Sequence, residues 1–125
     1  MKIYVTGLGV VSGIGIGVSE NIEALRQRKH GIGKITLFPT ALDVPVSEVK
    51  RSNEELKKLI SLPPQRTVSR TALLGMIAAK EAMKDAGLTP SLRIGFISAT
   101  SVGGMDLSEH FYESFKKNPG QGRLR

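Results

Sequence analysis

Two short motifs in this 125-residue chain combine residue types that could do chemistry. Gly9, Gly13 and Gly15 form a GxxxGxG turn after an apolar run, and a helix start near Gly15 could hold a phosphate. Tyr112 and Lys116 are spaced as YxxxK, a pairing that can donate a proton. Together these residues could bind the phosphates of a dinucleotide and donate a proton.

These two motifs resemble those of the short-chain dehydrogenases, which use NADPH or NADH. Three details depart from that family's pattern. Leu8 stands where the family has Thr, directly before the first glycine of the motif. No second strand-helix unit with a ribose-reading residue follows, unless residues 34–37 serve, and Tyr112 comes about two such units too early. A glycine motif without its context is a weak signal, so this resemblance remains an alternative.

Other catalytic groups are scarce in this sequence. The chain has no cysteine, which excludes a cysteine nucleophile, a disulfide framework and thiolate metal sites within these residues. His30 follows a predicted helix and His110 lies on the last predicted helix, so we assign neither histidine a catalytic role. We therefore expect no metal site and no cofactor of the chain's own.

The formal net charge of +7 favours an acidic partner. Nucleic acid is a poor candidate, because the chain has only 6 aromatic residues (Tyr 2, Phe 4, Trp 0) and no recognisable nucleic-acid-binding motif. The N-terminus is neither a signal peptide nor a membrane-spanning segment. We therefore expect a cytoplasmic protein that binds no membrane and no nucleic acid.

The first half of the chain predicts one strand and two helices. Residues 1–17 form an apolar run that is typical of a buried strand leaving by a glycine-rich turn. A helix over residues 19–29 would be capped by Ser19, stopped by Gly31, and packed on the core through Ile22 and Leu25. Residues 33–49 read as a loop or short irregular strands.

Two further helices have clear sequence signals. Ser52 and Glu55 form a capping box for a helix over 53–61, which Pro63 and Pro64 close. A longer helix over 67–86 is stopped by Gly87, with Leu88 and Pro90 after it. Small and flexible residues recur along this helix and predict its buried stripe: Ala72, Met76, Ala79, Met83 and Ala86. Leu73, Leu74 and Ile77 are expected to widen this stripe, so that the helix is buried over much of its circumference.

The last part predicts a second strand over 93–100, a tight turn at 102–104, a helix over 106–117 and a loop over 118–122. The fold class is therefore α/β. Two strands do not make a stable sheet unless others pair beside them. We expect an incomplete sheet, and a chain that is oligomeric, unstable or covered by something at its sheet edges.

A second resemblance extends along most of the chain. Four separated blocks occur in the same order as in the β-ketoacyl-acyl carrier protein synthases, the condensing enzymes with a thiolase-like fold. These blocks are Val5-Thr6-Gly7-Leu8-Gly9-Val10-Val11-Ser12, His30-Gly31-Ile32 with Ile35-Thr36-Leu37-Phe38, Gln65-Arg66 with the Ala-rich helix to Leu88, and Arg93-Ile94-Gly95-Phe96-Ile97 leading to Thr100-Ser101-Val102-Gly103-Gly104.

The resemblance covers roughly residues 2–110 and corresponds to the family's N-terminal part. It implies that residues 1–125 are the N-terminal portion of one β-ketoacyl synthase domain, within the first βαβ half of a thiolase-like fold, with no second domain. This sequence departs from the family at Gly13, where Pro is usual, at Ser101, where Gly is frequent, and at Pro63-Pro64, where charged residues are frequent.

The activity that the resemblance implies is the decarboxylative condensation of an acyl thioester with malonyl-acyl carrier protein. The family's nucleophilic cysteine, and its two histidines or histidine and asparagine, lie beyond the matching part, so the resemblance places no catalytic residue here. It places Val102 beside the acyl pocket and Arg66 where basic residues receive the acidic, phosphopantetheinylated carrier protein. It also implies a homodimer and no dissociable cofactor.

Two readings of this resemblance stay open. The chain is the N-terminal part of an active synthase, or part of a synthase-like subunit that lacks the nucleophile and pairs with an active partner. A cysteine at a strand-to-helix turn downstream favours the first reading, and another residue there favours the second. In either case we expect these 125 residues to be inactive alone.

Overall fold

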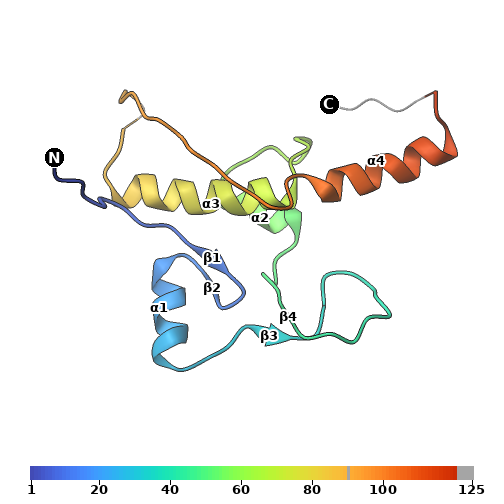
Figure 1. Cartoon of the computed structure of the whole chain (residues 1–125), viewed down its shortest axis with the longest axis horizontal. Coiled ribbons are helices and arrows are strands. Elements are labelled where there is room, and N and C mark those ends of the chain that lie inside the picture. Colours follow the sequence, from blue (N-terminus) through green and yellow to red (C-terminus); the bar gives the residue numbers. More distant parts are fainter. Residues whose placement is uncertain (90, 121–125) are drawn as a thin grey trace.

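The computed structural model describes residues 1–89 and 91–120, in which helices alternate with very short strands (Figure 1). The elements, in chain order, are β1 (Val11–Ser12), β2 (Gly15–Ile16), α1 (Val18–Arg26), β3 (Ile32–Gly33), β4 (Val46–Ser47), α2 (Asn53–Leu59), α3 (Arg70–Asp85) and α4 (Met105–Lys117). Among these residues β1 pairs with β2 and β3 with β4, both antiparallel, as two separate two-stranded sheets. The architecture is a partial α/β fold with incomplete sheets.

The glycine-rich opening forms a hairpin before any helix begins. Val11 pairs with Ile16 and Ser12 with Gly15, so the chain reverses at Gly13. The predicted glycine-rich turn is present, but a short second strand, β2, follows it before α1 begins. The predicted short strands between residues 33 and 49 take the form of β3 and β4, with Gly33 opposite Val46.

Both ends of α1 differ from the sequence prediction. Its N-cap is Gly17, with φ 96°, and Ser19 lies inside the helix. Its left-handed C-terminal residue is Arg28, with φ 53°, and the Lys29 amide donates to the Ala24 carbonyl at 2.8 Å. Gly31 is therefore not the helix stop. This glycine instead packs against the backbone at Gly13, where a Cβ would come within 2.6 Å of the Gly13 carbonyl oxygen.

The face that α1 buries is also not the predicted one. Asn21 and Ala24 are buried, whereas Ile22 and Leu25 are exposed. The Asn21 side-chain amide donates to the carbonyls of Gly15 at 2.9 Å and Gly17 at 2.8 Å, so a polar residue fastens the hairpin to the helix. A side-chain amide whose hydrogen bonds are all made can be buried at little cost in free energy. Hydrophobic periodicity does not predict such a buried polar residue.

The start of α2 confirms its sequence signal. The Glu55 amide donates to Ser52 Oγ at 3.2 Å, and the Ser52 amide donates to Glu55 Oε2 at 2.7 Å. Backbone donation from Ser52, and next the Arg51 side chain, lower the pKa of Glu55 below its ordinary value of 4.5. The helix ends at Leu59, two residues before the expected end.

The hydrophobic core lies between α2 and α3. Leu56 and Leu73 are fully buried and Ile77 is nearly so. Leu73 and Ile77, which were expected to widen the buried stripe of α3, confirm that part of the prediction, whereas the predicted burial of Met76 and Met83 is wrong, since they are 42% and 40% exposed. Around this core pack partly buried side chains: Val11, Ile16, Val49, Ile60, Leu62, Val68 and Leu74.

The C-terminus of α3 confirms the glycine signal. Gly87 has φ 63°, and the Leu88 amide donates to the Met83 carbonyl at 3.0 Å. This pattern is the left-handed helix stop expected from the sequence. Pro90, which the sequence analysis placed after this stop, lies outside the described residues, as do residues 121 and 122 of the predicted loop.

The N-terminal segment lies along α3 as extended chain without a strand partner. Gly7 and Gly9 approach the α3 backbone closely, next to Ala78, Ala82 and Ala86. Small residues on both sides permit this approach. The expected burial is wrong, because the preceding residues 3–5 are largely exposed, Ile3 by 84%.

Two carboxylates of α3 hold this N-terminal segment. The Leu8 amide donates to Asp85 Oδ2 at 3.0 Å, and the Val10 amide donates to Glu81 Oε2 at 3.0 Å. The other oxygen of Glu81 accepts from the Val18 amide at 2.7 Å, at the first turn of α1. One side chain of α3 thus joins the hairpin and α1.

The second predicted strand, residues 93–100, is extended chain that forms no ladder among the described residues. The prediction of a strand is wrong for this structure, because within the described ranges no other strand pairs with these residues. The turn after it and α4 confirm the sequence prediction, α4 beginning at Met105 rather than at residue 106. No helix in the described ranges is both long and apolar enough to cross a membrane.

We predict that Gly9→Ala destabilises the chain by about 1–3 kcal/mol through overpacking. A Cβ at Gly9 would lie 2.8 Å from the Ala78 carbonyl carbon and 2.9 Å from the Ala82 amide nitrogen. Urea unfolding followed by circular dichroism measures the effect. Gly33→Ala is the matched control, since a Cβ at Gly33 meets nothing within 4 Å. Equal stabilities for the two variants would contradict the close approach.

Candidate functional site

The glycine turn does not present a free phosphate site. The Val18 amide, in the first turn of α1, donates to Glu81 Oε1 at 2.7 Å. The Ile16 amide donates to Glu20 Oε2 at 2.8 Å. The carboxylates of Glu81 and Glu20 thus accept the hydrogen bonds that these amides would donate to a pyrophosphate. Their negative charge would also repel a pyrophosphate. This local structure disfavours dinucleotide binding at the turn.

Tyr112 and Lys116 lie far from this turn. Both are on α4, which extends from the N-terminal end of α3, whereas the glycine turn is fastened at Glu81 near the other end of α3 (Figure 1). Lys116 Nζ stands 5.9 Å from the centroid of the Tyr112 ring, and Tyr112 is 61% exposed. The two dehydrogenase-like motifs are therefore not assembled into one site.

The turn that contains Val102 is well defined. Thr100 Oγ1 accepts from the amides of Val102 at 3.2 Å and Gly103 at 3.0 Å. Gly103 has φ 61°, a conformation that favours glycine. Val102 itself is exposed, so its side chain is available to border a ligand or another part of a protein.

Arg66 lies in another turn, just before α3. Its amide donates to the Pro63 carbonyl at 3.0 Å, and its residue is exposed. Among the described residues its side chain takes part in no ion pair. A positively charged side chain on a proline-stiffened turn is suited to contact an acidic surface.

Polar contacts bring the segments of Arg66 and Val102 to the same end of α3. The Arg70 amide, four residues after Arg66, donates to Asp106 Oδ2 at 2.7 Å. A Cβ at Gly104 would lie 3.7 Å from the Ser69 Cβ, so the turn after Val102 touches the N-cap of α3. Asp106 therefore positions the Val102 turn next to the segment that carries Arg66.

A hollow of 980 Å³ runs along α3 between this helix and residues 96–103. Its floor is the stripe that the sequence analysis expected to be buried: Ala72, Met76, Ala79 and Met83. Phe96, Thr100 and Gly103 line its other side, and Lys80 and Lys84 stand on its edge. Val102 does not line it, although both Gly103 and Thr100 do. The hollow is mainly apolar and holds no pair of catalytic groups.

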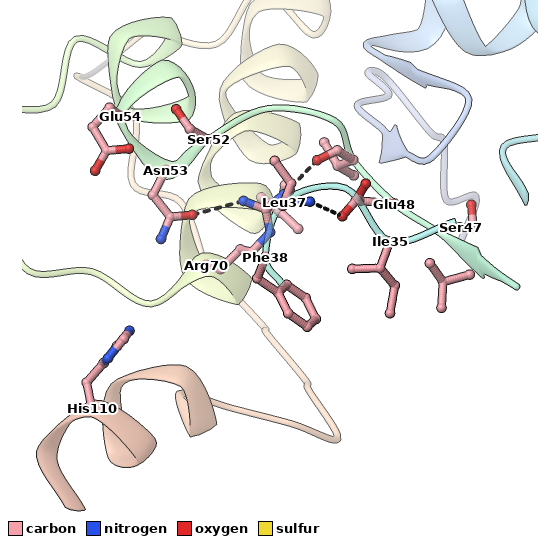
Figure 2. Close-up of a pocket in the computed structure, with 13 residues that line it drawn as sticks. Ile35, Leu37, Phe38, Ser47, Glu48, Ser52, Asn53, Glu54, Arg70 and His110 are labelled. Carbon is pink, nitrogen blue, oxygen red and sulfur yellow. Dashed lines mark hydrogen bonds between the residues drawn. The ribbon is translucent and has the colours of Figure 1, made fainter. Parts of the chain in front are cut away.

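A second hollow, of 650 Å³, lies between α3, the loop before α2, and α4 (Figure 2). Its arginine, Arg70, donates to the carbonyls of Val49 at 2.7 Å and Arg51 at 3.0 Å, and to Asn53 Oδ1 at 2.9 Å. Since protein groups already bind this guanidinium, Arg70 ties α3 to the start of α2. His110 of α4 lines the same hollow, and we assign it no catalytic role.

Glu48, on the edge of this second hollow, organises the loop opposite it. Its carboxylate accepts from the hydroxyl and amide of Thr36 and from the Leu37 amide, at 2.5 Å, 3.1 Å and 3.0 Å. The Thr36 hydroxyl, and then the backbone amides of Leu37 and Thr36, lower the pKa of Glu48 below 4.5. In the described ranges no group of acidic or histidine side chains could hold a metal ion.

Several side chains that position this region were missed by sequence reasoning. Glu81, Asp85, Asp106 and Glu48 each bind backbone amides of a distant segment, up to 77 residues away for Asp85. An isolated carboxylate on a helix or loop gives no sequence signal for such a contact. The only hint was the small-residue pattern of Gly7 and Gly9, which requires something to lie close by.

Comparison with known proteins identifies the family. A family model described as "Beta-ketoacyl synthase, N-terminal domain" matches residues 1–123. The chain therefore belongs to the β-ketoacyl synthase family. This confirms the resemblance drawn from the four sequence blocks.

The curated relatives are considerably longer than this chain. It is 31% identical to 3-oxoacyl-[acyl-carrier-protein] synthase 2 of Coxiella burnetii, with 90% of this chain and 28% of the relative covered. It is 28% identical to nodulation protein E of Rhizobium meliloti, with 95% and 30% covered. For the Staphylococcus aureus (strain MRSA252) synthase 2 the identity is 29%, with 87% and 27% covered. The chain thus spans under a third of these relatives, and no solved structure matches it significantly.

We predict that acidification releases the loop held by Glu48. A lowered pKa means that the carboxylate stabilises the fold fully above its ordinary pKa of 4.5, and that this stabilisation is lost as pH falls through the lower folded-state value. The amide resonances of Thr36 and Leu37 should titrate together with a midpoint below pH 4.5. Glu48→Gln should abolish that step, and its persistence in this variant would contradict the assignment.

Proposed function

We propose that this chain forms the N-terminal part of a 3-oxoacyl-[acyl-carrier-protein] synthase, folded as part of the first βαβ half of a thiolase-like domain. The observation that carries the proposal is the family match over residues 1–123. Residues 1–125 then belong to a single domain. The reaction served is the decarboxylative condensation of an acyl thioester with malonyl-acyl carrier protein in fatty acid or polyketide biosynthesis.

In this proposal the chain contributes structure and binding residues to the synthase but no catalytic group. In the family, a cysteine thiolate accepts the acyl group from its thioester, malonyl-acyl carrier protein loses CO₂, and the resulting enolate attacks the acyl-cysteine. None of the 125 residues is a cysteine, so the acyl acceptor lies elsewhere. These residues alone are then inactive, and no cofactor of their own is required.

Val102 is proposed to border the acyl chain. Its turn is fixed by Thr100 Oγ1 and the positive φ of Gly103, so the valine side chain has a defined place. The turn opens onto the apolar hollow along α3 through Thr100 and Gly103. A small apolar side chain at this point would limit the space available to an alkyl chain.

Arg66 is proposed to contact the acyl carrier protein. Its exposure, its position on the turn before α3, and the chain's net charge of +7 support an acidic partner. The names of the relatives include the acyl carrier protein, which would bring the phosphopantetheine thiol with it. A cytoplasmic homodimer is the assembly that we propose for the whole synthase.

A synthase-like subunit without the nucleophile remains the second candidate, because the family's nucleophile position lies beyond the part of the family that this chain matches. In that case the same Val102 and Arg66 positions would shape product length and partner contact. A dinucleotide-dependent dehydrogenase is disfavoured by Glu81 and Glu20, whose carboxylates occupy the amides of the glycine turn. Titration with NADPH, followed by fluorescence, should therefore show no saturable binding.

We predict no condensation product when this chain is incubated with acyl- and malonyl-acyl carrier proteins, because it lacks the acyl acceptor. Mass spectrometry of the carrier-bound acyl groups measures the outcome. The synthase 2 of Staphylococcus aureus, under the same conditions, serves as the positive control. Turnover by the chain alone would contradict the proposal that the acyl acceptor lies outside these residues.

We predict that Arg66→Glu weakens binding of acyl carrier protein by about 1 kcal/mol, or roughly fivefold in Kd. The reversed charge would repel the acidic partner, and the loss should shrink at high salt. Isothermal titration calorimetry at two salt concentrations measures it. Arg26→Glu, an exposed residue of the last turn of α1, is the matched control. An equal loss in both variants would show a general charge effect instead.

A further inference from the structure

One carboxylate joins the N-terminal ends of two helices. The first turn of α3 contains no acidic residue of its own, although such residues stabilise a helix at that end. Asp106, in the first turn of α4, supplies this charge instead, because its Oδ2 accepts from the Arg70 amide at 2.7 Å. The positive ends of both helix dipoles therefore meet at one side chain, at the place where α4 begins beside the start of α3 (Figure 1).

The amides in the first turn of α3 have one local and one distant acceptor. Ser69, the buried N-cap residue, accepts from the Ala72 amide at 3.2 Å through its side chain. The Arg70 amide is one of the four that a helix leaves unpaired at its start, and its acceptor, Asp106, lies 36 positions further along the chain. The Arg70 guanidinium is bound at the start of α2, so it leaves this carboxylate to the backbone amide.

The start of α4 has no capping side chain. Its N-cap is Gly104, whose carbonyl accepts from the Leu107 amide at 3.0 Å. Gly104 also lies against the N-cap of α3, since an added Cβ would stand 3.7 Å from the Ser69 Cβ. Among the described residues, the bond between Asp106 and the Arg70 amide is the one hydrogen bond that joins α4 to α3. This single contact therefore places the start of α4.

The shape and the placement of the Val102 turn depend on different residues. Thr100 Oγ1 and the positive φ of Gly103 give the turn its shape, and both features lie within the turn. Asp106, four residues after Val102, holds the turn at the N-terminal end of α3. Without this bond the turn would keep its local shape but would carry Val102 to a different place.

We propose that Asp106 is the positioning residue for Val102 and thereby a determinant of acyl-chain length. This role rests on the proposed function, in which Val102 borders the acyl chain. With the Asp106 carboxylate on the Arg70 amide, the valine side chain is held at the end of α3, where it limits the length of an alkyl chain. Asp106 acts through Val102, so it is not a catalytic residue.

The first test measures the position of the turn in the full chain without a ligand. NMR follows the Val102 methyl signals, and a nuclear Overhauser effect between Gly104 and the Ser69 side chain reports contact with α3. Asp106→Ala should shift the methyl signals and abolish the Overhauser effect. Asp106→Asn should retain both, because its amide oxygen still accepts from the Arg70 amide. Unchanged methyl signals and an unchanged Overhauser effect in Asp106→Ala would overturn the proposal.

Glu109→Ala is the matched control, since Glu109 is an exposed acidic residue of the same helix. It removes an equal charge from α4, yet the Val102 signals should not move. Circular dichroism of each variant separates displacement of the turn from loss of a helix. If Asp106→Ala loses helix content, Asp106→Glu decides instead, because it keeps the charge and lengthens the side chain. Unmoved Val102 signals in that variant would overturn the proposal.

The second test compares the binding of octanoyl-pantetheine and acetyl-pantetheine. These thioesters cannot acylate a cysteine of the chain, because it has none. Asp106→Ala should change the ratio of the two Kd values by about tenfold, which is the discrimination that one methylene of misfit produces in an apolar site. In a Val102→Ala background the same substitution should leave the ratio unchanged, because its effect passes through Val102. An equal effect in both backgrounds would overturn the proposal.

Failure of the proposed function gives a different result. If octanoyl-pantetheine does not shift the Val102 methyl signals, or if Val102→Ala leaves the Kd ratio unchanged, then Val102 does not border the acyl chain. The role of Asp106 in chain length falls with it, while the Overhauser effect still decides whether Asp106 positions the turn. If Val102→Ala changes the ratio and Asp106→Ala does not, the proposed function of Val102 stands and the role of Asp106 is overturned.

Discussion

The carboxylate of Glu81 is the contact on which the arrangement of the N-terminal half depends. Its two oxygens bind the amides of Val10 and Val18, which lie on either side of the β1–β2 hairpin. Because both amides are fixed to one side chain of α3, the hairpin and α1 are placed relative to the helix in a single step. Asp85, one turn further along α3, accepts a hydrogen bond from the Leu8 amide in the same way. An amide bonded to a charged acceptor forms a stronger hydrogen bond than one between neutral groups.

Sequence reasoning succeeded where a signal and its consequence lie within one helix turn. The Ser52–Glu55 capping box and the Gly87 helix stop are both present as predicted, because each depends on residues that are neighbours along the chain. Reasoning failed where a distant segment decides the outcome. Gly31 carries the signal of a helix stop, yet it serves a close approach to Gly13, while Arg28 takes the left-handed position. Likewise, residues 93–100 have strand propensity, but no strand in the described part of the chain pairs with them.

The candidate binding residues could be named from the sequence, but their relation could not. Val102 and Arg66 are separated by 36 positions, and no sequence signal between them predicts that their segments meet. The structure joins these segments through Asp106 and the Arg70 amide, at the N-terminal end of α3. This contact joins residues that are 36 positions apart, so it depends on tertiary structure rather than on a local sequence signal. The family match extends over both segments but assigns a role to neither residue.

α3 is surrounded on three sides, and this has a consequence for how the protein can evolve. Leu73 faces the core, Ala82 lies under the N-terminal segment, and Met76 floors the apolar hollow. An ordinary amphipathic helix keeps one wide surface on which random substitutions are harmless. Here the open positions are interspersed between these contacts: added atoms at Gly75 would meet nothing within 4 Å, and Lys80 and Lys84 are exposed. In a deep mutational scan, α3 would therefore record selection on several faces of the helix, with tolerant positions between them.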